Sequence, residues 1–360
     1  MDLDDYTSDI LIERVSWRPR YILNSIVTIR DAIQPTFVPR IPGSSNISLL
    51  NTLPPELLHI VFELLDFRSL SRFARVCHQG KATVESLPVY RDLIKHAFTA
   101  LAAFGRTELI TFHSAASIHT ALLSEKCVAC EQFAPFLFLP TSERCCYECL
   151  HRDRSLRVIT SGMVRKCFGL TPKDLRRIPS MLSIPGTYSV GHTITYRRRT
   201  RLFSLKQSKA LGVTHHGSAE AMELFVTSQN AGKLTTNEMH DVRWLTGHPS
   251  TIGSDANVPV DRFCGMASTG FPALQPNDVL EKGVWCLGCR ANFLNYHGTR
   301  ILDAETRLLV SGADPLLPLL DLEHRARSKS TFVEHIRVCK GAKDLLRGLE
   351  PSVQASKDFL

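Results

Sequence analysis

The cysteines of this 360-residue chain fall into short, regularly spaced pairs that are typical of metal ligands. Cys127 and Cys130 form one CxxC pair, and Cys146 and Cys149 form a second pair after 15 intervening residues. Each pair turns two thiolates toward one point, and the intervening loop brings the pairs together as a tetrahedron, the arrangement that suits Zn²⁺. Cys145 is an alternative to Cys146, although Cys146 gives the cleaner CxxC spacing.

A second metal site is predicted late in the chain. Cys286 and Cys289 form a third CxxC pair, and His335 and Cys339 follow at a spacing of four residues, which places them on one face of a helix. Three cysteines and one histidine would complete a tetrahedral site. His297 is a nearer substitute for His335, because 45 residues separate Cys289 from His335.

Both predicted sites are saturated by four protein ligands, so we expect two structural Zn²⁺ ions and no catalytic one. The sequence contains no GxSxG, P-loop or HExxH motif, and His215-His216 beside Gly217 reads as a turn. We therefore expect the protein not to be an enzyme.

The remaining cysteines bear on the cellular compartment. The total of 11 is odd, so a fully paired disulfide framework is excluded, and Cys77, Cys167 and Cys264 are expected to be buried thiols. The acidic start of the sequence does not resemble a secretory signal, and no run of roughly 18 apolar residues predicts a membrane span. We expect a protein of the cytoplasm, the nucleus or both.

The net charge of +8 is concentrated in one segment. Residues 144–209 contain 15 Lys and Arg against 3 Asp and Glu, so the rest of the chain is mildly acidic. Within this segment, Arg197, Arg198, Arg199 and Arg201 form a cluster beside Tyr196, which could bind an acidic or phosphorylated protein target. A zinc-stabilised nucleic-acid-binding protein that uses residues 144–209 is the alternative, although no two-cysteine, two-histidine finger is present.

These residues must be positioned by an α+β fold. Residues 1–46 are expected to be a flexible N-terminal arm, residues 47–105 a small helical bundle, and residues 106–350 an irregular zinc-supported α+β domain. The alternation of residues 187–196 predicts one half-buried strand, and residues 228–260 are polar enough to predict a long loop.

The helical segment opens with a distinctive run, followed by further apolar positions: Leu53-Pro54-Pro55-Glu56-Leu57-Leu58, then Ile60, Val61, Phe62, Leu64, Leu65, Leu70, Phe73, Val76 and Tyr90. Residues 48–97 thereby resemble an F-box, a small helical module. The cysteine pairs, Tyr196-Arg197-Arg198-Arg199-Thr200-Arg201, Trp285-Cys286-Leu287-Gly288-Cys289 and the segment from Phe332 to Cys339 are similar to a group of filamentous-fungal (ascomycete) F-box proteins.

The resemblance implies a substrate-receptor (adaptor) subunit of an SCF-type cullin-RING ubiquitin ligase. The F-box would dock on the Skp adaptor, and the C-terminal domain would capture an unknown target protein for ubiquitination. The docking residues that it implies are Leu53, Pro54, Leu57, Leu58, Ile60, Val61, Leu70 and Val76. Core packing is the competing interpretation for each of them, above all for Leu57.

Overall fold

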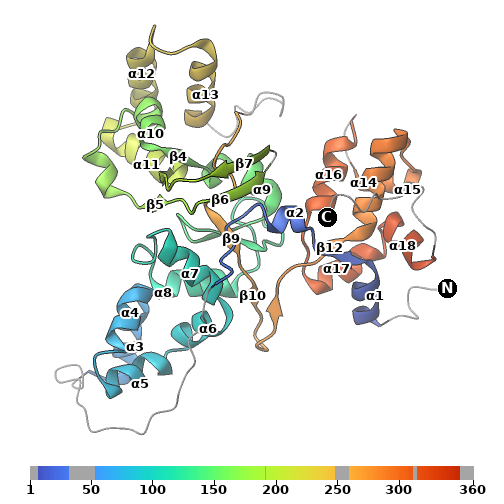
Figure 1. Cartoon of the computed structure of the whole chain (residues 1–360), viewed down its shortest axis with the longest axis horizontal. Helices are drawn as coiled ribbons and strands as arrows, with labels where there is room; N and C mark the ends of the chain where they lie inside the picture. Colours follow the sequence, from blue (N-terminus) through green and yellow to red (C-terminus); the bar gives the residue numbers. More distant parts are fainter. Residues whose placement is uncertain (1–6, 32–52, 191, 248–258, 311–313, 349–360) are drawn as a thin grey trace.

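The computed structural model describes residues 7–31, 53–190, 192–247, 259–310 and 314–348. The fold is α+β, as predicted, with helices gathered into three lobes around short strands (Figure 1). Three separate clusters of buried apolar side chains form the cores of these lobes.

The first lobe consists of six short helices whose starts follow from the sequence. Asp66 caps one helix by accepting a hydrogen bond from the Ser69 amide (2.9 Å), and Pro55 and Pro88 occupy first helical turns, where a missing N–H costs nothing. The helices are α3 (Pro55–Glu63), α4 (Phe67–Phe73), α5 (His78–Ser86), α6 (Pro88–His96), α7 (Phe98–Arg106) and α8 (Ala115–Leu123).

The first core continues across the expected boundary between residues 105 and 106. It includes a three-stranded antiparallel sheet in the order β3-β2-β9, with Phe136 of β2 paired to both Cys145 and Gly270. The strands are β2 (Phe136–Phe138), β3 (Glu143–Cys145) and β9 (Ser268–Gly270), and α9 (Tyr147–Arg152) and a 3-10 turn (Arg154–Leu156) follow β3.

The expectation of a flexible arm over residues 1–46 is wrong for residues 7–31. Here α1 (Ser8–Val15), β1 (Ser16–Trp17) and α2 (Arg20–Leu23) pack into two cores, because this segment supplies apolar side chains that would otherwise be exposed. The Val27 amide also donates to the Ser268 carbonyl (2.8 Å). The predicted linker at residues 42–46 lies outside the described residues.

The second lobe packs helices on a small antiparallel sheet in the order β4-β8-β5 (Figure 1). The sheet consists of β4 (Val158–Thr160), β5 (Ser180–Leu182) and β8 (Arg201–Ser204), and a 3-10 turn (Asp174–Arg177) precedes β5. The helices are α10 (Ser161–Phe168), α11 (Leu205–His216), α12 (Ala219–Asn230) and α13 (Thr236–Thr246).

Two predictions for residues 187–260 are wrong. Residues 187–196 form a hairpin of β6 (Gly186–Val190) and β7 (His192–Tyr196) rather than one strand. Residues 228–260 include α13, whose Thr235 and Glu238 form a capping box that starts a helix despite the polar composition. Residues 248–258 of that predicted loop lie outside the described residues.

The third lobe contains the C-terminal helices and α1 (Figure 1). Its strand β12 (Trp285–Cys286) pairs with β1, so segments from opposite ends of the chain lie side by side. The elements of this lobe are α14 (Leu287–Thr299), α15 (Ala304–Leu309), α16 (Leu316–His324), α17 (Lys329–Ile336) and α18 (Lys340–Leu346). The antiparallel pair of β10 (Ala273–Leu274) and β11 (Leu280–Glu281) precedes them and packs against the first core beside α8. In the described part of the chain, every helix is too short or too polar to cross a bilayer.

Candidate functional site: two metal-ligand groups and an exposed helix face

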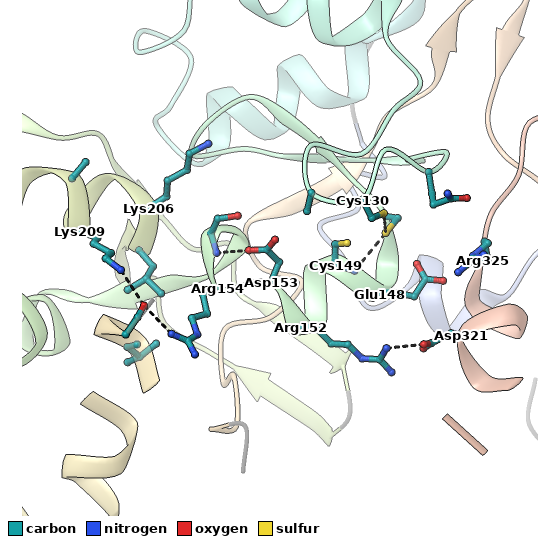
Figure 2. A pocket seen from close by; sticks show the side chains of 18 of the residues that line it. Cys130, Glu148, Cys149, Arg152, Asp153, Arg154, Lys206, Lys209, Asp321 and Arg325 are labelled. Carbon is teal, nitrogen blue, oxygen red and sulfur yellow. Dashed lines mark hydrogen bonds and ion pairs between the residues drawn. The ribbon is translucent and has the colours of Figure 1, made fainter. Parts of the chain in front are cut away.

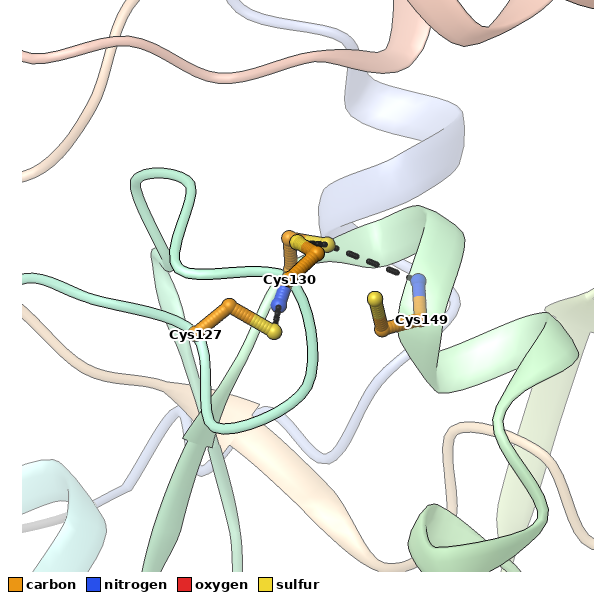
Figure 3. A group of neighbouring side chains, drawn as sticks. Cys127, Cys130 and Cys149 are labelled. Atoms are coloured by element: carbon orange, nitrogen blue, oxygen red, sulfur yellow. Dashed lines mark hydrogen bonds between the residues drawn. The ribbon is translucent and has the colours of Figure 1, made fainter. Parts of the chain in front are cut away.

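The first cysteine group converges as its spacing predicts. The Sγ atoms of Cys127, Cys130, Cys146 and Cys149 all lie within 4.8 Å of one another, and Figure 3 shows the thiols of Cys127, Cys130 and Cys149 around a common centre. The Sγ atoms of Cys130 and Cys146 are 3.6 Å apart. These residues therefore form a group of four thiols that could hold a metal ion.

Local structure selects Cys146 over Cys145 in this group. Cys146 caps α9, its Sγ accepting a hydrogen bond from the Cys149 amide (3.4 Å), which orients both thiols to the same side. Cys145 lies on β3 and faces the buried core instead, where burial raises the pKa of its thiol. Within the group, hydrogen bonds from Cys146 and Cys149 hold the pKa of Cys127 well below its usual range, while their bonds to Cys127 raise the pKa of Cys146 and of Cys149.

The second group also forms as predicted, with His335 rather than His297. The Nε2 atom of His335 lies 3.1 Å from the Cys289 Sγ, and Cys339 lies 3.9 Å and 4.0 Å from the sulfur atoms of Cys286 and Cys289. Hydrogen bonds from Cys289 and Cys339 hold the pKa of Cys286 well below its usual range. His297 instead packs near the ring of Phe293 on α14.

Two glycines, whose packing role the sequence analysis did not predict, allow this second group to close. A Cβ atom on Gly288 would lie 2.1 Å from the Ala342 amide nitrogen, and one on Gly341 would lie 2.3 Å from the Gly288 carbonyl oxygen. Backbones of α14 and α18 therefore touch beside Cys289 and Cys339, an approach that only glycine permits. The glycine inside the third cysteine pair, Cys286-Leu287-Gly288-Cys289, could have indicated this close approach.

The sulfur separations in both groups fit tetrahedral coordination. Sulfur atoms 3.6 to 4.0 Å apart are too distant for a disulfide bond of about 2.05 Å. A tetrahedron with metal–sulfur bonds of about 2.3 Å has edges of about 3.8 Å. Both groups can thus hold a metal ion without large movement of their ligands.

A different feature, on α3, is a stripe of exposed apolar side chains. Leu57 is 49% exposed, Ile60 57% and Leu64 71%, and Val61 completes the i, i+3, i+4, i+7 pattern of one helix face. The opposite face packs into the first core through Leu58 and Phe62. Leu64 was not among the predicted docking residues, although its position in the same heptad stripe could have indicated it.

The other predicted docking residues divide between surface and core. Leu53 and Pro54 are exposed immediately before α3, and Val76 is exposed after α4. Leu58 and Leu70 are buried, so they stabilise the helices and leave contact with a partner to the exposed stripe. An exposed apolar face of this kind on a folded protein marks an interaction surface.

The basic segment does not form one continuous surface. Arg144 is buried, and its guanidinium donates to the carbonyls of Ala121 (2.6 Å), Ala134 (2.6 Å), Phe271 (3.0 Å) and Pro272, which joins β3 to distant loops. Burial lowers the pKa of Arg144 to about 9.

The predicted arginine cluster is similarly divided. Arg197 and Arg198 are exposed after β7, whereas the Arg199 guanidinium donates to the Arg106 carbonyl. Arg201 lies on β8 and donates to the Ser180 hydroxyl (2.7 Å). Arg199 thus contacts the first lobe and Arg201 a neighbouring strand of the second lobe, and Arg197 and Arg198 are exposed.

A cleft of about 760 Å³ lies beside the first cysteine group, between α9, α11 and α16 (Figure 2). Its lining carries both signs of charge, and several of these side chains contact other parts of the protein. Arg152 pairs with Asp321 (2.7 Å), and Arg154 and Lys209 both donate to the Gly247 carbonyl (2.9 and 3.0 Å). These contacts join the second and third lobes to the metal-ligand region.

Comparison with known proteins assigns one of these regions. Residues 50–93 match the family model of F-box-like domains, so the chain contains an F-box-like domain over α3–α6. F-box domains in general bind the Skp adaptor of cullin-RING ligases. No curated protein and no solved structure matches the chain.

Proposed function

We propose that the protein is a substrate-receptor subunit of an SCF-type cullin-RING ubiquitin ligase. The exposed apolar stripe of α3, within the F-box-like domain, is the observation that supports this proposal most strongly. Docking on the Skp adaptor would bury Leu57, Ile60, Val61 and Leu64 and supply the apolar core that a stable interface needs. The other lobes would hold the target near the ubiquitin-charged enzyme and raise its effective concentration, with no catalytic residue of this chain involved.

We further propose that each cysteine-rich group holds one structural Zn²⁺ ion. Four thiolates, or three thiolates and an imidazole, suit this ion, and no place is left for a reactive water. The first ion would fix α9 to the loop at Cys127, and the second would fix α17 and α18 to α14. The ions would then shape the surfaces that present a target.

The nucleic-acid alternative has less support from the geometry. The Tyr196 hydroxyl donates to the Arg262 carbonyl (2.8 Å) and its ring packs 6.0 Å from that of Phe263, so it is not free to stack on a base. Buried Arg144 and paired Lys206, which lies 2.6 Å from Glu143, further reduce the available positive charge.

Affinity purification of the wild-type chain and of a Leu53→Ala/Pro54→Ala variant would test the proposal. Both residues are exposed beside the stripe and outside the core, so the variant should fold. We expect the variant to lose the Skp adaptor and cullin while it retains the target. Adaptor recovery that is equal for both proteins, or absent from both, would contradict the proposed role.

A further inference from the structure

A second cavity lies on the second lobe, and its charges are not compensated. It has a volume of about 470 Å³ and lies between the start of α10, the 3-10 turn at Asp174–Arg177 and the strands β5 and β8. Arg165, Arg176 and Arg201 line it, and no Asp or Glu is among its described lining residues. The first cleft, in contrast, is lined by both signs of charge, and Arg152 pairs with Asp321 there.

The three arginines come from separate elements and are available to a ligand. Arg165 projects from α10 and Arg176 from the 3-10 turn, and both are exposed. Within the described ranges, neither guanidinium makes an ion pair or a hydrogen bond. Arg201 donates to the Ser180 hydroxyl, which holds its side chain at the cavity. Because solvent screens exposed charges, the three arginines can line one cavity without an acidic partner, and each can attract an anion that enters it.

Neutral donors of the same cavity favour an anion as well. Ser161 is the first residue of α10, so the positive end of that helix dipole lies at the cavity wall. Ser161 and Arg165 are four residues apart and therefore lie on one helix face. Ser180 supplies a second hydroxyl. Guanidinium forks with hydroxyl donors are the groups that bind phosphate oxygens through charge-assisted hydrogen bonds.

We propose that this cavity, named here the Arg165 pocket, binds the phosphate of a phosphorylated serine or threonine in a target protein. This inference rests on the proposed function as a substrate receptor. The remaining walls are apolar and include exposed Phe112 with Leu170 and Ile178, which can accept a side chain next to the phosphorylated residue. A nucleic-acid strand would need a continuous basic track, whereas neighbouring Lys166 pairs with Glu238 (3.0 Å) and Arg199 with the Arg106 carbonyl.

Fluorescence anisotropy with the full, zinc-loaded chain can test the pocket. The probe is a labelled degenerate peptide library with a fixed central phosphoserine, and the comparison is the same library with serine. We expect at least tenfold tighter binding of the phosphorylated library. An Arg165→Gln/Arg176→Gln variant should lose this preference, and Arg307→Gln, a control on α15 outside the pocket, should keep it.

Further measurements distinguish a phosphorylated protein segment from other phosphate ligands and check that the variant is folded. Free phosphoserine should compete at least tenfold less well than the phosphorylated library, and equal competition would overturn recognition of a protein segment in favour of a small phosphate ester. If the wild-type chain shows no preference for the phosphorylated library, the proposed phosphopeptide binding is wrong. The same conclusion follows if the chain lacks this preference and instead binds single-stranded RNA in a way that depends on Arg165. Unchanged zinc content and unchanged Skp adaptor binding of the Arg165→Gln/Arg176→Gln variant would show that only the pocket was altered.

The pocket and the ligase role can also fail separately. A wild-type chain that binds the phosphorylated library but not the Skp adaptor would support the pocket and contradict the proposed function.

Discussion

Replacing Cys339 by serine should remove one metal ion and unfold two helices of the third lobe. Cys339 is buried between α17 and α18, and its Sγ lies 3.9 Å and 4.0 Å from those of Cys286 and Cys289. The neutral hydroxyl of serine cannot replace the thiolate as a ligand at neutral pH. We therefore expect two Zn²⁺ ions in the wild-type protein and one in the Cys339→Ser variant.

The size of the effect follows from the small core of this lobe. Ordering α17 and α18, of 8 and 7 residues, costs about 15–30 kcal/mol in conformational entropy. The buried side chains of Leu11, Val15, Phe332 and Ile336 stabilise the lobe by about 6–12 kcal/mol in total. A structural Zn²⁺ ion contributes about 10–16 kcal/mol, which closes the difference. Without the ion, these two helices should not remain folded.

Elemental mass spectrometry and hydrogen exchange can measure both effects. Amides of residues 329–346 should lose protection in Cys339→Ser, while those of the first lobe retain it. Cys264→Ser is the matched control, because this buried thiol donates to the Leu150 carbonyl outside both groups. A variant that keeps two ions, or that loses one with unchanged exchange in α17 and α18, would refute the reasoning.

Three further predictions concern docking, the Arg144 contacts and a buried carboxyl. Replacing Leu57 and Leu64 by alanine should weaken Skp adaptor binding about 30- to 140-fold in calorimetry, because burial of their exposed 49% and 71% contributes about 2–3 kcal/mol. Replacing Arg144 by lysine should lower the free energy of unfolding in urea by about 3–5 kcal/mol, since one ammonium cannot serve four carbonyls. Burial raises the pKa of Glu323 from 4.5 to about 7, so between these pH values the folded state keeps a proton that the unfolded state releases. About 3 kcal/mol of stability is therefore lost as the pH rises from 4.5 to about 7. Glu323→Gln, measured in urea at pH 5 and pH 8, should remove this loss.

Each of these predictions has a contradicting result. Leu224 is 73% exposed on α12, and Leu224→Ala should leave adaptor binding unchanged. If this control lowers adaptor affinity as much as the α3 variant does, the α3 stripe is not the docking surface. A change below about 1 kcal/mol in Arg144→Lys would show that the carbonyl contacts contribute little. A pH dependence that is identical in wild type and Glu323→Gln would remove Glu323 as its source.

The cysteine spacing was sufficient to predict both ligand groups, because a CxxC pair fixes two ligands through local geometry alone. The choice of Cys146 over Cys145 and of His335 over His297 followed from the same CxxC and i, i+4 rules. The F-box-like helices were also predictable, since Pro and Asp at helix starts are local signals.

Features that depend on long-range contacts were not predictable. Residues 7–31 read as an arm because nothing local shows that Ser16 pairs with Cys286 at the far end of the chain. Similarly, the Arg165 pocket joins α10, a 3-10 turn and two strands, and its charge is visible only after these elements pack. The β6–β7 hairpin was missed because alternation continues through its turn, so the period-2 pattern alone could not locate the reversal.

Native mass spectrometry of the full chain mixed with purified Skp adaptor would test the central claim most directly. One spectrum reports the adaptor stoichiometry and the number of bound metal ions. We predict one chain, one adaptor and two Zn²⁺ ions in a single complex. A zinc-loaded chain that stays separate from the adaptor would contradict the proposed function.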